Sequence, residues 1–333
     1  MIKVFFISSE NNNSFGVNRV LYDLKNFLKK KCYIKRSSNF YDFINTEYNI
    51  IHIHGCWKLY IFFYFILSKI KKLKIIISPH GMLDPYSLNQ KKIRKIIFWH
   101  LFQKHILKFS DQIIVNSLNE KKNVLKIVDH KKIIIIPHGI KFIKQKYDRK
   151  KNYNKKLNFV FFSRIDHVKN LDKLVKIWIS NPFFENLKLS IYGEISDHKY
   201  FNLINHKISK YKNIKYYGAL NKNKIKILAK YDVFIFPSKS ENFGLVVLEA
   251  MAAGLYIVLN KKLPWKNIAS EGFASLIYFN NTNLTKEIKN LIKRKSQLRS
   301  VNYFNKIKMF LHKNYNWKNI SKIYLLNYKK LLK

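Results

Sequence analysis

The segment VFIFPSKSENFGLVVLEAMAAG, residues 233–254, combines a short apolar run, a polar loop and the start of an apolar helix. Residues 233–236 are apolar at every position, which predicts a strand buried on both faces. We expect a helix from about Leu245, so the backbone N–H groups near Phe243, Gly244 and Leu245 lie at a helix N-terminus. Such an end binds phosphate through those donors and the helix dipole. The segment therefore predicts one strand–loop–helix unit with a site for an anion.

Further apolar runs rich in Ile, Val, Phe and Tyr recur along the chain, each ending in polar residues or glycine. They occupy residues 2–7, 50–53, 74–77, 112–115, 133–136, 159–162, 187–192, 214–217 and 256–259. Amphipathic stretches such as 20–28, 171–179 and 222–230 lie between them. Strands that alternate with helices predict an α/β fold with doubly wound parallel sheets.

A polar stretch at residues 137–157 separates the predicted strands into two sets and is interpreted as an inter-domain linker. We therefore expect a first Rossmann-like domain at residues 1–145 and a second at 156–316, facing each other across a cleft. The last stretch, 317–333, is predicted to be a terminal helix. Ligands of such sheets bind beyond the carboxyl ends of the strands, so the residues there are the candidate site.

The charge of the chain is strongly positive. Its 333 residues include 64 Lys and Arg against 19 Asp and Glu, a formal net charge of +45. The basic residues are mostly Lys and are spread along the chain, which is typical of a composition bias. An anionic membrane surface or an anionic substrate are the functional alternatives. Nucleic acid is not expected as a partner, because no helix-turn-helix, zinc-finger or RNA-binding aromatic signature is present.

Composition and targeting signals limit the class of protein further. The hydrophobic content of 47% argues against disorder, and two cysteines, Cys32 and Cys56, cannot form a disulfide framework, so a reducing compartment is expected. Residues 1–9 are not a signal peptide. The apolar run 59–67 is about half a membrane span, which predicts a helix that is buried or touches a membrane surface. Residues 91–108, basic and aromatic, are either a core-facing helix with a solvated basic face or a helix on an anionic bilayer.

Charged residues at the strand ends of the second half suggest a diphosphate site. Arg164 and Lys169 follow its first strand, and two cations beside a helix N-terminus suit a diphosphate. Glu241 and Glu249 are eight positions apart, so they suit different ends of one extended ligand, with a carboxylate for vicinal hydroxyls as on a ribose. The alternatives are solvated surface charges and, for Glu249, a helix-capping role.

Histidine–glycine pairs mark three strand ends of the first half. His54, His80 and His138 each precede a glycine, but no carboxylate spacing accompanies them, so a metal site is not expected. His80 is interpreted as a hydrogen-bonding or charge-stabilising group, or else as a loop histidine bonded to nearby backbone. The loop after the first strand contains Gly16 and then Arg19, which are further candidates.

The stretch 240–254 resembles the signature of glycosyltransferase family 4, in which seven residues separate two glutamates. Other segments match the same family in order and spacing: 163–164 and 169–170, the turn at Gly218, and 232–238. Residues 78–83 and Trp57 are similar to the acceptor-side domain of surface-polysaccharide members. The resemblance covers nearly the whole chain.

The resemblance implies a GT-B fold, with a C-terminal helix that crosses back to the first domain. It implies a retaining transferase that moves a sugar from a UDP- or GDP-sugar to a hydroxyl of a glycan or lipid-linked acceptor, in lipopolysaccharide or capsule synthesis. No metal or other cofactor is expected. The implied location is cytoplasmic, with peripheral contact to the inner face of the membrane as a further expectation. A sugar-nucleotide epimerase and a non-catalytic basic protein that binds membrane surfaces are the alternatives.

The same resemblance implies roles for individual residues. Arg164 and Lys169 would contact the diphosphate, Glu241 the hydroxyls of the donor sugar and Glu249 the ribose. His80 stands where relatives carry a residue near the anomeric centre, so Glu241 and His80 are the expected catalytic residues. The remaining contacts to sugar and phosphate are expected from Asn242, Phe243, Gly244 and Leu245. Relatives have a pair of glycines in the first loop, whereas Gly16 stands alone here.

Overall fold

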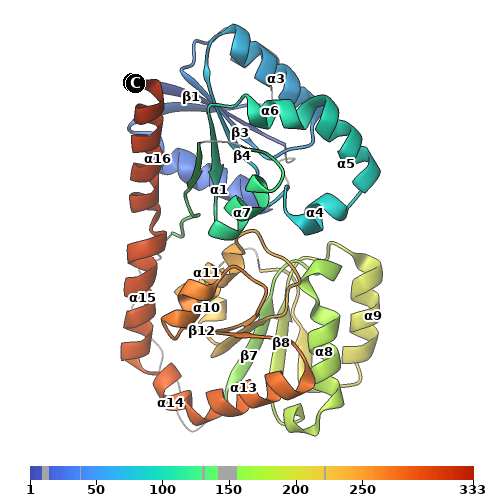
Figure 1. Cartoon of the computed structure of the whole chain (residues 1–333). Helices are drawn as coiled ribbons and strands as arrows, with labels where there is room; N and C mark the ends of the chain where they lie inside the picture. Colours follow the sequence, from blue (N-terminus) through green and yellow to red (C-terminus); the bar gives the residue numbers. More distant parts are fainter. Residues whose placement is uncertain (10–14, 38, 130–131, 142–155, 221–222) are drawn as a thin grey trace. The chain divides into compact units, whose positions relative to one another are not determined.

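The computed structural model describes residues 1–9, 15–37, 39–129, 132–141, 156–220 and 223–333 (Figure 1). The chain divides into two compact units. Unit 1 comprises Met1–Lys141 and Tyr315–Lys333, and unit 2 comprises Phe142–Asn314. Residues 142–155 of the predicted linker, and with them the expected domain end at residue 145, lie outside the described residues. The expected boundaries therefore stay a prediction.

Unit 1 is built on a six-stranded parallel sheet in the order β2-β1-β3-β4-β5-β6. Its strands are β1 (Ile2–Ser8), β2 (Cys32–Arg36), β3 (Ile50–His54), β4 (Lys74–Ser78), β5 (Gln112–Val115) and β6 (Ile133–Ile135). β3 and β5 are buried along their whole length, including His52, His54 and Gln112, as strands rich in Ile and Val and covered on both faces are expected to be. The order reverses between β1 and β3, which makes the loops after these two strands the switch point of this sheet.

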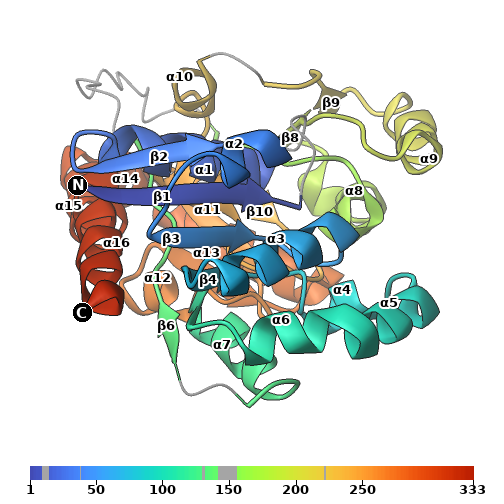
Figure 2. The same ribbon diagram turned by 90° about the horizontal axis from the view of Figure 1, so that it is seen from above.

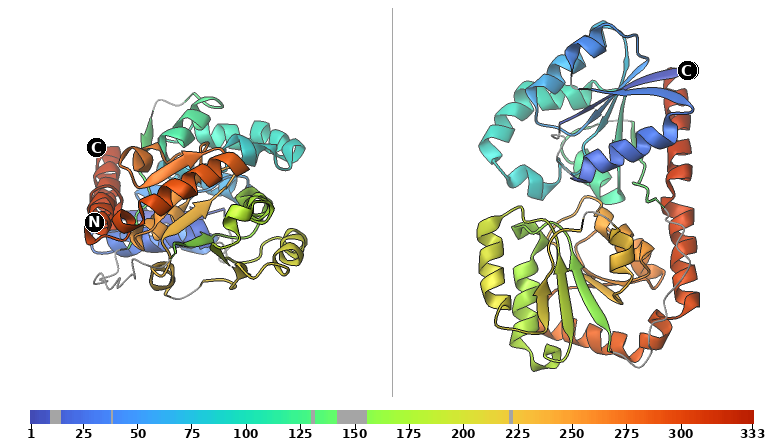
Figure 3. Two further views of the ribbon diagram at one scale, coloured as in Figure 1. Left: turned by 90° about the horizontal axis from the view of Figure 1, so that it is seen from below. Right: turned by 180° about the vertical axis from the view of Figure 1, so that it is seen from behind.

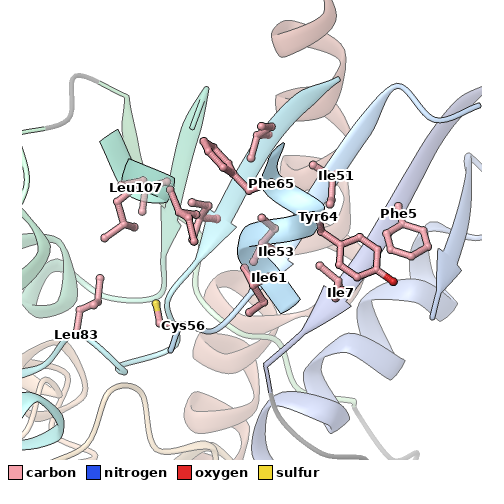
Figure 4. Packing of buried hydrophobic residues seen from close by; sticks show 14 of the residues in the cluster. Phe5, Ile7, Ile51, Ile53, Cys56, Ile61, Tyr64, Phe65, Leu83 and Leu107 are labelled. Carbon is pink, nitrogen blue, oxygen red and sulfur yellow. The ribbon is translucent and has the colours of Figure 1, made fainter. Parts of the chain in front are cut away.

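Helices cover the sheet of unit 1 (Figure 2). They are α1 (Phe15–Leu28), α2 (Phe40–Ile44), α3 (Leu59–Ile70), α4 (Pro85–Asn89), α5 (Lys92–Phe98), the π-helical turn η1 (Trp99–Gln103), α6 (Lys104–Lys108), α7 (Leu118–Leu125) and α16 (Trp317–Leu332). The apolar core lies between strands and α3, where Ile61, Tyr64 and Phe65 pack over Phe5 and Ile53 (Figure 4). The terminal helix α16 packs against α1, so the chain ends in unit 1.

Unit 2 contains a second six-stranded parallel sheet, in the order β12-β11-β10-β7-β8-β9. Its strands are β7 (Asn158–Phe162), β8 (Lys188–Tyr192), β9 (Ile214–Tyr216), β10 (Val233–Phe236), β11 (Tyr256–Asn260) and β12 (Ala274–Ile277). β8 and β9 lie on one side of β7, and β10 begins the other side. The switch point of this sheet is therefore between β7 and β10.

The helices of unit 2 follow its strands in regular alternation (Figure 3). They are the 3₁₀ turns η2 (His167–Lys169) and η3 (Pro182–Phe184), and α8 (Leu171–Ser180), α9 (His198–Ile208), α10 (Lys224–Leu228), α11 (Leu245–Ala252), α12 (Lys266–Ser270), α13 (Asn281–Lys293), α14 (Lys295–Leu298) and α15 (Val301–Tyr315). The Asp232 carboxylate, just before β10, accepts two bonds from Arg299 at 2.9 and 3.0 Å, and both residues are buried. This ion pair ties the helical end of unit 2 to its sheet.

The structure confirms the α/β prediction and corrects some of its details. β2, with the sequence CYIKR, and β12, with the sequence ASLI, were not predicted, whereas the other two edge strands, β6 and β9, were. The loop expected at Gly16 and Arg19 is wrong, since α1 begins at Phe15 and buries Val17, Val20, Leu21 and Leu24 on one face. The expected helix 91–108 consists of α5, η1 and α6 in succession. Within the described ranges, none of the helices combines the length and the apolarity that a membrane crossing requires.

Candidate functional site

The switch point of unit 2 brings two sequence-predicted segments to one edge of its sheet. β7 and β10 pair in parallel, so the loops that follow them leave the sheet side by side. The loop after β7 carries Arg164 and Lys169, and the loop after β10 carries Glu241. This is the place where doubly wound sheets bind ligands.

The loop after β7 is held in shape by Asp166. Its carboxylate accepts the backbone N–H groups of Val168 and Lys169 at 3.0 and 3.2 Å, which caps the turn η2. Asn170 then adopts a left-handed conformation, with φ 59°, and its side chain donates to the Pro237 carbonyl at 3.2 Å. These bonds fix the position of Lys169 against the loop that follows β10.

Lys169 and Glu241 form an ion pair that is almost buried. The Lys169 Nζ atom lies 2.5 Å from Glu241 Oε1, and the two side chains are 11% and 10% exposed. The same carboxylate oxygen accepts the hydroxyl of Ser238 at 2.9 Å. An ammonium group has three protons, so Lys169 retains donors for a second anion while it holds Glu241. Two residues that the sequence predicted for one ligand are thus in direct contact.

Arg164 differs from Lys169 in its exposure. Its guanidinium lies 3.8 Å from the Asp166 carboxylate, and its side chain is 60% exposed. Because the Arg164 guanidinium is exposed, it can bind an anion with two parallel hydrogen bonds without giving up a buried interaction of its own. The structure therefore places both cations at the expected edge of the sheet. Arg164 is largely exposed, whereas Lys169 is nearly buried and held by Glu241.

The N-terminus of α11 lies directly after Glu241. Gly244 caps it in the left-handed region, with φ 74°, a conformation that glycine adopts without strain. The N–H groups of the first turn, at Leu245 and the residue after it, have no partner within the helix. The Phe243 ring is buried against Trp265, with ring centroids 5.2 Å apart, so it anchors the loop and contributes its backbone to the site. Asn242 is part-buried beside it.

Glu249 lies inside α11 and has a different cationic partner. Its Oε1 atom is 3.3 Å from Lys224 Nζ, and the two side chains are 21% and 29% exposed. Lys224 Nζ in turn stands over the Phe162 ring at 5.4 Å from the centroid. The two glutamates thus occupy separate positions, each beside a different lysine.

The histidines of unit 1 gather at the carboxyl edge of its sheet. β3 and β4 pair so that His54 is opposite Ser78, and the next residues bring His54 Nδ1 to 3.0 Å from His80 Nε2. The His80 and His138 rings are stacked with centroids 5.5 Å apart. His52 lies two residues before His54 on the same face of β3. Its ring nitrogens form hydrogen bonds with the hydroxyl groups of Ser78 and Tyr328 at 2.8 and 2.9 Å.

Asn116 extends this histidine chain. Its Nδ2 atom lies 3.3 Å from His80 Nδ1, so each ring nitrogen of His80 is within hydrogen-bonding distance of another side chain. His54 Nε2, at the other end of the chain, is buried and has no hydrogen-bond partner among the described residues.

Burial keeps these imidazoles neutral. It lowers the pKa of His80 to about 4, and it lowers the pKa of His52, His54 and His138 well below the usual value, helped by neighbouring rings. His80 is held further by its loop: its φ is 54°, and the next N–H, of Gly81, donates to the buried Glu120 at 2.6 Å. At neutral pH His80 therefore offers hydrogen bonding and no positive charge.

Arg19 and Gly16 are placed differently from the expectation. Arg19 pairs with Asp23 one turn later in α1, with Nε 3.0 Å from Oδ2. Gly16 lies in the first turn of α1, where a Cβ atom would meet nothing within 4 Å. Neither residue shows the close backbone approach that a phosphate-binding glycine loop requires. Part of the predicted loop, residues 10–14, lies outside the described residues.

Sequence reasoning missed several residues that complete these sites. Lys224 gave no signal among 64 cations, and Ser238 and Asn116 lie in segments where many polar residues compete. The role of Asp166 could have been predicted from the sequence. An aspartate commonly caps a helical turn by accepting from the backbone N–H groups two and three residues later, here those of Val168 and Lys169. Among the residues that the structure describes, no group of three His, Cys, Asp or Glu side chains is arranged to hold a metal ion.

Family models match both halves of the chain. Residues 143–308 match the family model of the glycosyl transferases group 1, and residues 15–142 match that of glycosyltransferase family 4. A 41.2 kDa uncharacterized protein from the cps region of Klebsiella pneumoniae is 29% identical over 256 residues, which are 73% of this chain and 69% of that protein.

Solved structures share the fold at low sequence identity. HepE from Anabaena in complex with UDP-glucose has a TM-score of 0.77 at 14% identity, covering 99% of this chain and 100% of that chain. WaaG, a glycosyltransferase involved in lipopolysaccharide biosynthesis, has a TM-score of 0.68 at 14% identity, covering 97% and 99%. These likenesses confirm the GT-B fold. The two family matches, which together span most of the sequence, show that the chain belongs to the group 1, family 4-type glycosyltransferases.

Proposed function

We propose that this enzyme is a retaining, metal-independent glycosyltransferase that uses a UDP- or GDP-sugar and adds the sugar to a hydroxyl of a glycan or lipid-linked acceptor. The observation that carries the proposal is the Lys169–Glu241 pair beside the N-terminus of α11. It joins a cation, a carboxylate and free helix donors at the switch point of unit 2. A nucleoside diphosphate sugar has the complementary groups: a diphosphate and vicinal hydroxyls.

In the proposed reaction the bond between the anomeric carbon and the diphosphate oxygen breaks, a bond to the acceptor oxygen forms, and the proton of the acceptor hydroxyl passes to the departing diphosphate. Lys169, Arg164 and the first-turn N–H groups at Leu245 stabilise the negative charge that develops on the diphosphate. They make a divalent cation unnecessary, because they supply the positive potential at the leaving group. Glu241, which Lys169 holds through Oε1, accepts hydrogen bonds from the donor sugar.

Two further residues complete the proposed donor contacts. Glu249 accepts from the ribose hydroxyls, with Lys224 holding its carboxylate at the edge of α11. His80 donates or accepts a hydrogen bond near the anomeric centre as a neutral imidazole, since burial keeps its pKa at about 4. Of its two ring contacts, the 3.3 Å bond to Asn116 is the longer and is the one that a sugar hydroxyl would replace.

The biological setting belongs to the proposal as well. A relative lies in a cps region, one structural neighbour was solved with UDP-glucose, and another takes part in lipopolysaccharide biosynthesis. These relationships support a role in a bacterial surface polysaccharide. The free, buried thiols of Cys32 and Cys56 support a cytoplasmic location.

The test is a donor screen with the purified chain. UDP- and GDP-sugars are incubated with and without acceptor glycans, and nucleotide release and the anomeric configuration of the product are measured. We expect turnover with one donor, retention of configuration, and equal rates with EDTA or Mn²⁺. Glu241→Ala and Lys169→Ala should lower kcat by at least about a hundredfold, as loss of a charge-stabilising group does. Lys173→Ala, an exposed lysine on α8, is the matched control.

Each part of the proposal has its own contradicting result. Inversion of configuration refutes the retaining mechanism, and strict dependence on Mn²⁺ refutes metal independence. Recovery of an epimerised donor instead of a transfer product would favour an epimerase. Full turnover in both site variants would show that the site assignment is wrong.

A further inference from the structure

Helix α3 exposes half of an almost entirely apolar surface. One face, with Ile61, Tyr64 and Phe65, is buried against the sheet of unit 1. The opposite face presents Leu59, Phe63, Ile66 and Ile70, with exposed fractions of 48%, 53%, 39% and 70%. Residues spaced by three and four positions lie on one side of a helix, so these four form a continuous stripe. A helix that is apolar on all sides is normally covered on all sides.

A second apolar stripe lies on α5 and the turn that follows it. Ile93, Ile96, Ile97 and Leu101 are 76%, 48%, 56% and 58% exposed, again with a helical spacing. The stripes belong to packed neighbours: Phe62 of α3 and Phe102 of η1 have ring centroids 5.0 Å apart. We call the two stripes together the α3–α5 face. Figures 1 and 3 show α5 projecting outward from the strands of unit 1.

Cations flank the α3–α5 face, and acidic side chains are missing from it. Lys92 and Arg94 stand on either side of Ile93, about 100° around the helix in each direction. Further cations, on α3, on α6 and in the turns beside α3 and α5, are Lys69, Lys71, Lys72, Lys91, Lys104 and Lys108. Between residues 58 and 108 the one acidic residue is Asp84, which is buried and accepts a bond from Asn123 at 2.9 Å. The face is therefore apolar at its centre and purely basic at its rim.

The pattern of charge selects the partner. A second copy of the chain would bring the same basic rim against itself, on a molecule of net charge +45, so charge repulsion opposes a symmetric dimer. Nucleic acid would satisfy the cations and leave the exposed isoleucines in water. An anionic lipid bilayer satisfies both, because its headgroups pair with the rim while the apolar stripe enters the acyl boundary.

We infer that the α3–α5 face is a docking surface for an anionic lipid bilayer, on which the enzyme lies without crossing it. The inference goes beyond the proposed transfer reaction and does not depend on it, because the face is formed by unit 1 elements outside the histidine chain and outside the donor-binding segments of unit 2. A docking role of this face would also account for some of the many Lys and Arg residues of the chain, because they would pair with anionic headgroups.

The experiment is vesicle flotation of the full chain at low and high salt. The vesicles contain either phosphatidylcholine alone or phosphatidylcholine with 30% phosphatidylglycerol. We expect binding to the anionic vesicles at low salt, reduced at least tenfold in 0.5 M NaCl, because exposed charges are screened. Ile93→Ser with Ile97→Ser should lower the affinity at least tenfold. Lys92→Gln with Arg94→Gln should lower it about thirtyfold at low salt.

Matched controls lie on unit 2. Leu203→Ser removes an exposed apolar side chain of α9, and Lys173→Gln with Lys176→Gln removes exposed charge from α8. Both should bind vesicles like the native chain. All altered residues are exposed, and thermal unfolding of each variant confirms that it is folded. Nucleotide release from a soluble donor is measured in parallel, so a failure of docking and a failure of the proposed reaction are distinguishable.

Several outcomes would overturn the inference. They are absence of binding to anionic vesicles, equal binding to neutral vesicles, or unchanged binding in the Ile93/Ile97 double variant. A native dimer by light scattering that the same double variant dissociates would assign the face to a second copy. Tight binding of an oligonucleotide that the Lys92/Arg94 variant abolishes, without vesicle binding, would assign it to nucleic acid.

Discussion

Acidification should unfold unit 1 through its buried histidines. His52, His54 and His138 are at most 5% exposed, and burial holds the pKa of each well below 6.5. The unfolded chain binds these protons at ordinary pH values, so their stabilising contribution is complete above pH 6.5 and is lost as the pH falls. His80, whose pKa burial lowers to about 4, loses about 2 kcal/mol between pH 7 and pH 5, and His52, His54 and His138 lose stability in the same direction. Even the loss from His80 alone is a substantial part of the stability of a typical domain, about 5–15 kcal/mol.

The perturbation that isolates this effect is His52→Gln. Glutamine can bond both Tyr328 and Ser78, the hydroxyl partners of His52, but it does not titrate. Urea unfolding followed by circular dichroism at pH 7, 6 and 5 gives the stability of the unit 1 transition. We expect the native chain to lose more than about 2 kcal/mol over this range and the variant to lose measurably less than the native chain.

The matched control is His206→Gln on an exposed face of α9, which leaves the buried chain of histidines intact. It should follow the native chain at every pH. A native stability at pH 5 within 1 kcal/mol of that at pH 7, or an unchanged pH slope in His52→Gln, would refute the reasoning.

Three further substitutions test the packing of the two units. Asp232→Asn should lower the stability of unit 2 by about 3–5 kcal/mol in urea unfolding, because it leaves the buried Arg299 without its counter-charge; a loss below 1 kcal/mol would contradict this. Gly193→Ala should lower the melting temperature strongly, since its Cβ would lie 1.7 Å from the Ser163 carbonyl oxygen. Gly16→Ala has no such neighbour and should stabilise the chain by about 0.5–1 kcal/mol without slowing turnover; reduced turnover would restore Gly16 to the site.

Local sequence pattern could predict the central strands and two of the four edge strands, β6 and β9, but not β2 and β12. The strands that are buried on both faces are dominated by Ile, Val, Leu and Phe, with single polar residues such as His52 and Gln112 in between, and each of them was predicted. β2, with Tyr33 exposed between Cys32 and Ile34, and β12, with three part-exposed positions, read as ordinary half-polar sequence. Their assignment depends on which strand lies beside them, which is a tertiary property.

The candidate site shows the same division. Motif spacing could identify Glu241 and Lys169, but not that they lie 2.5 Å apart, because that contact depends on β7 and β10 being neighbours. The His–Gly pairs were visible as strand ends, whereas the bond between His54 and His80 depends on the pairing of β3 with β4. Sequence alone cannot supply strand order, and strand order decides which loop residues meet.

The central claim is that the Lys169–Glu241 pair forms part of a nucleoside diphosphate site. Titration calorimetry of UDP and GDP with the native chain, Lys169→Gln and Lys173→Gln tests it most directly. A charge-assisted hydrogen bond is worth about 1.5–3 kcal/mol, so Lys169→Gln should weaken binding of the preferred nucleotide about 10- to 100-fold. Lys173→Gln should bind within about twofold of the native chain. Equal affinity in Lys169→Gln, or no binding of either nucleotide by the native chain, would contradict the account.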